Sequence, residues 1–341
     1  MADNASEAQT AKALLGSAPE WSLRRAFGAD WTSAVLALIA VLLIVGFFHP
    51  EFLSLGQLLN VAENSVYPAL IALGLVFLIP QNEIDLSVGG NYVLTGIIAA
   101  LMIRAGFNPS LAAAIALLGA VAVGLANAFT SQVIGIPSLI GTLAMGWMLH
   151  GMALAFSRGT QVTGMPLADP LFEILGGAKV LGVPASVILL AAAGVILAVV
   201  MRATPLGYRV RQIGSNPDAA AFSGIPIRRT KTIGYALAAF MAGLAGIVAL
   251  TFFTTGDPQS GGGIELFAVA GVVIGGTPLA GGTASIFGAI IGTVLLTAVS
   301  VGLVYFQIPA TWAQFATGAV ILSAVSIDGV VQRQRRAGVR R

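Results

Sequence analysis

The sequence has no cysteine and few charged residues, and each shortage excludes classes of protein. Without cysteine the chain forms no disulfide, uses no thiol in catalysis and binds no metal through thiolates. Two histidines, His49 and His150, are too few for a histidine-based metal site. Only 9% of the residues are charged, whereas soluble domains carry about 25%. We therefore expect no metal site, and a soluble globular domain is excluded.

Motifs for nucleotide hydrolysis and other catalysis are missing as well. None of the three lysines follows a glycine, so the chain has no G-x-x-x-x-G-K-[ST] loop and cannot itself be a P-loop ATPase. There is no H-E-x-x-H motif. A membrane-embedded hydrolase that uses Ser87 or Ser285 as its nucleophile would lack a plausible base. We expect no catalytic residue and no cofactor in this chain.

Long apolar runs fill most of the sequence. Of the residues 57% are hydrophobic, 42 are glycines and the mean hydropathy is +0.92. A helix needs about 20 apolar residues to cross a bilayer, and this window predicts an all-α polytopic membrane protein with about ten transmembrane helices. The predicted spans are 32–49, 59–80, 86–104, 110–132, 137–156, 184–201, 231–253, 264–279, 284–305 and 311–327. The span at 264–279 is short and bounded by glycines, so it could be re-entrant or broken.

The basic residues indicate an orientation for these spans. With the N-terminus inside and ten spans, 14 of the 17 Lys and Arg residues fall on the inner side and only Arg104, Arg158 and Lys179 on the outer side. The positive-inside rule therefore predicts that both termini are cytoplasmic. We expect residues 1–30 to form a cytoplasmic arm and residues 31–328 to form the membrane domain, with a cytoplasmic coupling loop at 202–231. Residues 329–341 are expected to form a basic cytoplasmic tail. The net charge of +3 marks topology rather than nucleic-acid binding.

The only sizeable outer loop, 158–183, mixes apolar side chains with Asp169, Glu173 and Lys179. It could be a docking surface for a soluble partner or a solvated connector.

Polar residues at membrane depth mark a candidate path. In "LIPQNEIDLSVGGNYVLTG", residues 78–96, the chain either forms a cytoplasmic loop or breaks inside the membrane, with Asp85 and Ser87 capping the next helix near a pore mouth. For any single polar residue, hydrogen bonding between helices is the simpler interpretation. As a group, Asn64, Ser65, Asn91 and Thr95 suit a sugar better than an ion. The candidate path residues are Asn64, Ser65, Glu83, Asp85, Ser87, Asn91, Thr95 and Glu265.

A second glycine-rich segment, residues 272–292, suggests an internal repeat. A shift of 192 residues places Gly89, Gly90 and Gly96 on Gly281, Gly282 and Gly288. Paired interrupted spans in two halves are typical of transporters, so an inverted repeat with interrupted helices is possible.

The stretch "GSNPDAAAFSGIPIRRTK", residues 214–231, predicts a short water-soluble helix. Asn216 is an N-cap, Pro217 occupies the first position, Asp218 suits the positive helix end, and Gly224 ends the helix. A helix of about two turns is unstable alone. We therefore expect a protein outside the membrane to hold it.

Three stretches resemble the sugar-type ABC importer permeases, the ribose, xylose and arabinose group. They are "IDLSVGGNYVLTGIIAA", the segment Thr204–Val248 and "ELFAVAGVVIGGTPLAGGTASIFGAIIGTVLL". The likeness runs from about residue 35 to residue 328. One difference is that family members usually have T-G-G before I-D-L-S, where this chain has Gln81, Asn82 and Glu83.

The resemblance implies a bacterial inner-membrane permease that dimerises, binds cytoplasmic ATPase subunits carrying ATP and Mg²⁺, and receives a monosaccharide, a pentose or related sugar, from a periplasmic binding protein. It implies that residues 216–223 are the coupling helix that rests on the ATPase. Carried over position by position, the contact residues are Asn216, Pro217, Asp218, Ala219, Ala220, Phe222, Ser223 and Gly224. The alternatives are a permease for branched-chain amino acids or nucleosides, and an ion-coupled secondary transporter with Glu63, Glu83, Asp85 or Glu265 as its coupling group.

Overall fold

The computed structural model describes residues 31–309 and, beyond them, residues 312, 315, 318, 319 and 322. The long helices are α3 (Thr32–Phe48), α4 (Leu55–Leu75), α5 (Val88–Arg104), α6 (Pro109–Phe129), α7 (Ser138–Ser157), α9 (Ala185–Ala203), α12 (Ile227–Phe253) and α14 (Ile286–Tyr305). The shorter elements are η1 (Pro50–Leu53), η2 (Ile79–Gln81), η3 (Thr130–Ile134), α8 (Pro170–Phe172), η4 (Glu173–Gly177), β1 (Lys179–Val180), β2 (Val183–Pro184), α10 (Pro205–Ser215), α11 (Pro217–Phe222) and α13 (Ile264–Ile274).

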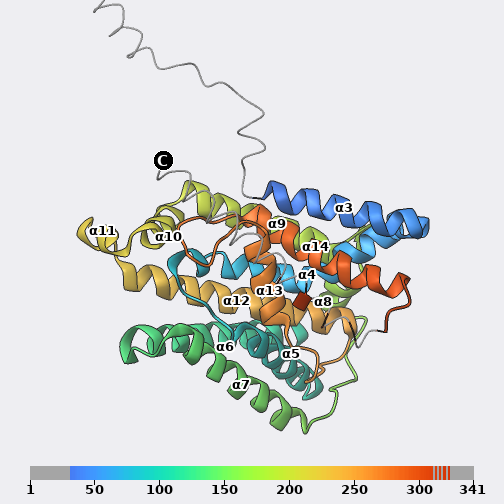
Figure 1. The fold of residues 1–341 in the computed structure, drawn as a ribbon. Coiled ribbons are helices and arrows are strands. Elements are labelled where there is room, and N and C mark those ends of the chain that lie inside the picture. The colour runs from blue at the N-terminus through green and yellow to red at the C-terminus, as the bar shows by residue number, and fades with distance from the viewer. Residues whose placement is uncertain (1–30, 310–311, 313–314, 316–317, 320–321, 323–341) are drawn as a thin grey trace, which may run out of the picture.

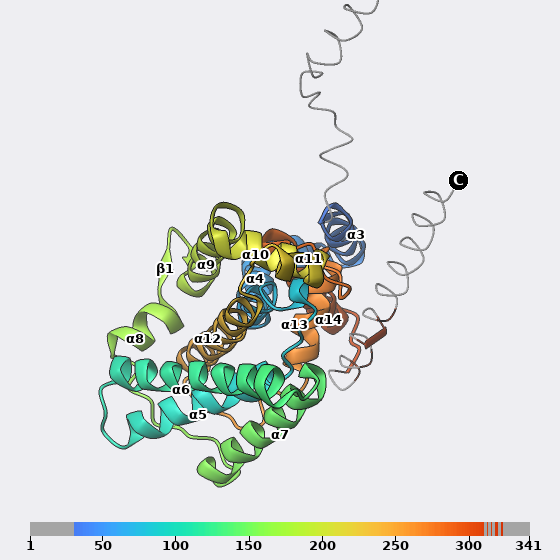
Figure 2. The ribbon, with the colours of Figure 1, turned by 90° about the vertical axis from the view of Figure 1, so that its left-hand side faces the viewer.

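The helices form three layers (Figure 1). Helices α4, α12 and α13 occupy the middle, with α3, α9 and α14 on one side and α5, α6 and α7 on the other, and the view turned by 90° agrees (Figure 2). Helix α12 packs against α4, α5 and α6. The core is formed by the C-terminal half of α4, from Ser65 to Leu75, together with α5 and α12. This half of α4 and most of α12 are buried.

Most predicted spans are confirmed as helices within a few residues. Six of the described helices are long and apolar enough to cross a membrane, and α3, α5 and α13 are shorter apolar helices. The chain is therefore a polytopic helical membrane protein. The prediction at 264–279 was too long, because α13 ends at Ile274. Its 11 residues extend only about 16 Å. The last predicted span, 311–327, lies almost wholly outside the described residues, as do the arm 1–30 and the tail 329–341.

The two ends of the helical bundle differ in what they carry. Helix α9 begins directly after the β1–β2 hairpin and ends at Ala203, where α10 and α11 follow. The hairpin and α11 therefore lie at opposite ends of the molecule, and Figure 1 shows α10 and α11 projecting together at one end. We call this the α11 end. At the other end, Val162 and Gly256 pair in an isolated antiparallel bridge that joins two loops.

Candidate functional site

Helix α11 forms as the sequence predicts. The Asn216 side chain accepts a hydrogen bond from the Ala219 amide at 3.0 Å, with Pro217 at the first helical position. Gly224 has φ +74°, and the Ile225 amide donates to the Ala220 carbonyl, which closes the helix end. The caps satisfy the free backbone groups of a helix that is too short to be stable alone.

The surface of α11 differs from the prediction at one residue. Asn216, Pro217, Asp218, Ala219, Phe222, Ser223 and Gly224 are exposed, and Phe222 is 94% exposed. Ala220 is buried, with 4% exposure, because it faces the body of the protein. In this conformation Ala220 offers almost no surface to a partner, and its part in the contact stays a prediction. An exposed aromatic ring on a capped helix is the kind of anchor that fills a partner's pocket.

A buried turn at Pro80 lies against the α10–α11 segment. Helix α10 packs against η2, and a Cβ at Gly214 would collide with the Pro80 carbonyl. The same carbonyl accepts a hydrogen bond from the Gly282 amide at 3.0 Å. Only glycine allows α10 to approach this closely. A displacement of α10 would therefore reach two non-helical segments, the one after α4 and the one before α14.

Glu83 joins this turn to the start of α12. Its carboxylate forms an ion pair with Lys231 at 2.6 Å and accepts hydrogen bonds from Tyr235 at 2.9 Å and Ser131 at 3.4 Å. The side chains of Glu83 and Lys231 are only 10% and 21% exposed. A carboxylate in such a place needs a cationic partner and further donors. We call Glu83, Lys231, Tyr235 and Ser131 the Glu83 cluster.

Asp85 holds the break before α5 in place. Its carboxylate accepts bonds from the Ser87 amide (2.8 Å), the Ser87 hydroxyl (2.6 Å) and the Asn127 amide group (3.3 Å), and all three residues are buried. Asp85 thus caps the turn into α5, as expected, although it is fully buried rather than at a pore mouth. The prediction that Ser87 also caps is wrong, because its hydroxyl bonds to Asp85 and Asn127 instead of a helix amide.

The four neutral polar residues do not form one cluster. Helix α12 lies between α4, which carries Asn64 and Ser65, and α5, which carries Asn91 and Thr95. Asn91 donates to the carbonyls of Ala120 and Ala239, and Thr95 donates to Asn91. Asn64 and Ser65 bond within α4. In this conformation only Asn91 bonds to other helices, and the role of the four residues in a path stays a prediction.

The predicted alignment of Gly89 and Gly90 with Gly281 and Gly282, at a shift of 192 residues, is also wrong. Gly89 and Gly90 are helical, in the first turn of α5, whereas Gly281 and Gly282 lie outside helices with φ +82° and +89°.

An exposed non-helical segment runs beside the start of α5. After α12 the chain turns back, and a Cβ at Gly261 would collide with Val93. Gly89 in turn leaves room for the Glu265 carboxylate. Gly89 lies 15 residues before the end of α5 at Arg104, which is roughly 22 Å along the helix. If α5 spans the membrane, Gly89 therefore lies deep in it. Residues 259–263, apart from the buried Gly261, are nevertheless exposed.

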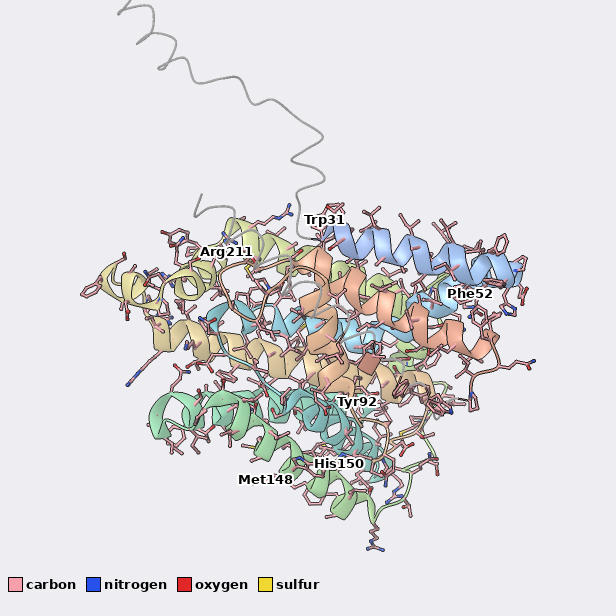
Figure 3. The ribbon with its side chains drawn as sticks, viewed as in Figure 1. Trp31, Phe52, Tyr92, Met148, His150 and Arg211 are labelled. Atoms are coloured by element: carbon pink, nitrogen blue, oxygen red, sulfur yellow. The ribbon has the colours of Figure 1, made fainter. Side chains whose placement is uncertain are left out.

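Irregular backbone at membrane depth occurs only where it is buried in protein or lines a water-filled space. We call residues 259–263 the re-entrant segment. Glu265 is partly exposed beside it, and His150 on α7 lies within electrostatic range of its carboxylate. Figure 3 shows His150 on α7 and Tyr92 on the neighbouring α5. Glu265 was predicted from the sequence, whereas Gln259 and Ser260 were not. Their signal was the run of three glycines at 261–263 that precedes a short apolar run.

Among the described residues, no group of three or more His, Asp or Glu side chains is placed to hold a metal ion.

Comparisons with known proteins agree with this architecture. Residues 57–325 match the model of the family described as branched-chain amino acid transport system / permease component. The chain is 32% identical over 313 residues to the ribose import permease protein RbsC of Escherichia coli, covering 91% of this chain and 98% of that protein. It is 33% identical to RbsC of Bacillus subtilis, covering 86% and 91%. It is 29% identical to the L-arabinose ABC transporter permease protein AraH of Azospirillum brasilense, covering 92% and 93%.

No solved structure matches the chain. The family match covers most of the sequence, from the third residue of α4 to beyond the end of α14. These findings confirm the resemblance on which the sequence analysis rested. The chain belongs to the family of membrane permease components described as branched-chain amino acid transport system / permease component.

Proposed function

We propose that this chain is the membrane-spanning permease subunit of an ABC importer in the bacterial inner membrane and that it transports a monosaccharide, a pentose or a related sugar. The observation that carries the proposal is the near full-length similarity to the ribose and L-arabinose permeases. The chain would not hydrolyse ATP. A separate cytoplasmic ATPase would bind ATP and Mg²⁺, and a periplasmic binding protein would deliver the sugar at the opposite face.

Helix α11 is the proposed contact with the ATPase. Its exposed Phe222 would enter a pocket on the ATPase, and its buried Ala220 would carry motion into the membrane domain. Two connections would pass this motion on to the non-helical segments. One is the close contact of Gly214 with Pro80, and the other is the Glu83 cluster. Closure of the ATPase pair would thus move segments on both sides of the path as rigid bodies.

The re-entrant segment is the proposed path in each subunit, and a second copy of the chain would complete it. The face near it carries Glu265 and the partly exposed His150. Ionisable groups inside a membrane face protein or water. In a homodimer whose path lies between the two copies, these ionisable groups would face protein on one side and water on the other.

The family description names branched-chain amino acids, which makes a hydrophobic zwitterion the alternative substrate. Uptake assays with ribose, arabinose, allose and leucine in parallel would separate the two classes. An ion-coupled transporter is disfavoured because one of its candidate coupling groups, Glu83, is already paired with Lys231.

The test of the coupling role is Phe222→Asp in the complete importer. We expect normal membrane insertion but lost ATPase association and sugar uptake, since a charge replaces the anchoring ring. Phe222→Tyr, which keeps the ring, should retain both. Ala220 is left unchanged because its side chain is buried. Unchanged uptake in Phe222→Asp would refute the proposed coupling.

A further inference from the structure

A cavity of about 300 Å³ lies between α5, α12 and the two loops 158–169 and 254–263. Small-molecule sites begin at roughly this volume, so the cavity is large enough for one small solute. It lies beside the last turns of α12, at the end that points away from α11, and beside α5 from Tyr92 to Ile97. It is separate from the Asp85 and Glu83 groups, none of which lines it.

The rim of the cavity is held in a fixed shape. Val162 and Gly256 exchange two backbone hydrogen bonds, at 2.8 and 2.9 Å, across loops far apart in the sequence. Next to this bridge, the Gln161 side chain donates to the Asp257 carboxylate at 3.1 Å. The other carboxylate oxygen accepts from the Gln259 amide at 2.9 Å. A site organised before binding loses less free energy to ordering than a flexible one.

The lining combines hydrogen-bonding side chains with apolar ones. Gln161, Asp257, Ser260, Thr255 and the Tyr92 phenol supply the polar groups. Ile97, Leu250 and Phe253 supply apolar side chains. This combination is typical of small-molecule pockets.

The charges of the lining select a chemical class. It contains one carboxylate and no Lys, Arg or His, so an anion would be repelled. Asp257 is acceptor-only when ionised, and its oxygens retain lone pairs for donors on a ligand. A solute that carries several hydroxyl groups together with C–H groups matches this mixed lining.

We propose that this cavity binds one neutral polyhydroxylated solute of monosaccharide size within a single subunit, at the end of the molecule opposite α11. The inference rests on the proposed function only in taking sugars as the probes. It adds a holding site that shares Ser260 with the re-entrant segment and is complete without a second copy.

The natural absence of cysteine provides the test. Single cysteines are introduced as Ser260→Cys and Thr255→Cys, which line the cavity, and as Leu167→Cys, which is exposed on the same rim loop outside it. Labelling by a membrane-impermeant methanethiosulfonate is followed in the complete importer, with only intact assemblies counted. With ribose, arabinose or allose at about ten times its dissociation constant, the rate at the cavity cysteines should fall by roughly tenfold, because only empty sites react. The rate at Leu167→Cys should not change.

A second variant checks the ligand chemistry. Asp257→Asn in the Thr255→Cys background should abolish the protection by sugar, since the acceptor for the hydroxyl groups is weakened. No protection by any of the three sugars, or protection by choline alone, would overturn the proposal. Sugar uptake is measured in the same preparations. Uptake without protection removes the cavity site and leaves the proposed function intact, whereas absent uptake counts against the function itself.

Discussion

At the scale of single residues, Glu83 shows how a charge is accommodated inside this protein. Its carboxylate is nearly buried. Lys231, Tyr235 and Ser131 satisfy it from two other parts of the chain. The sequence reveals the unusual carboxylate but not its partner, because 148 residues separate Glu83 from Lys231.

Lys231→Met should therefore be strongly destabilising. It leaves a buried carboxylate without its cation, which typically costs about 3–5 kcal/mol. The free energy of unfolding, measured by titration with a denaturing detergent, should fall accordingly. The double variant Glu83→Gln with Lys231→Met should recover most of the loss, since neither charge remains.

The matched control is Arg229→Met, an exposed basic residue on the same helix. Its effect should stay within about 0.5 kcal/mol. If Lys231→Met behaved like this control, the Glu83 cluster would have no role in stability.

At the scale of elements, hydrophobic runs predicted the helices well and their interruptions poorly. The bounds of α3, α5, α7 and α14 lie within two residues of the predicted ones. Each of these runs is predominantly apolar, so its length largely defines it. The coupling helix α11 was also predictable, because its caps are local in sequence.

The interruptions depend on contacts that a single sequence does not display. The fold of residues 259–263 onto α5 requires Gly261 against Val93. The break before α5 requires Asn127, 42 residues away from Asp85. For the same reason the path residues expected from polarity alone, such as Asn91, turned out to bond between helices.

The re-entrant segment gives a prediction about water. Gly262 and Val195 are both exposed, Val195 in the apolar helix α9 and Gly262 beside Glu265. A methanethiosulfonate reacts with the thiolate, which forms only in water. Gly262→Cys should therefore react readily with a hydrophilic reagent in membranes, whereas Val195→Cys, facing lipid, should not. A cysteine at Gly262 meets no neighbouring atom. Equal and slow labelling of the two would show that the segment lines no aqueous space.

At the scale of the whole molecule, the two ends of the helical bundle serve different functions in the proposed importer. The α11 end presents a capped helix with an exposed aromatic ring. The other end presents the bridged loops and the cavity. The long buried helix α12 begins next to α11 and ends at the cavity, so it connects the two. A push on α11 and a solute at the far end thus act on the same rigid element.

This division requires one orientation in the membrane, with the α11 end inside. Of the basic residues, 14 fall on that side of the predicted topology and 3 on the other. Because cytoplasmic loops retain Lys and Arg during insertion, this bias should fix the orientation. In intact spheroplasts, an impermeant maleimide should label Leu167→Cys and leave Ala221→Cys unlabelled. Both side chains are exposed, so access to water at each face decides the result. Opening the cells should make Ala221→Cys reactive, which shows that its thiol was shielded only by the membrane. Labelling of Ala221→Cys in sealed cells would place α11 in the periplasm, where no ATPase can reach it.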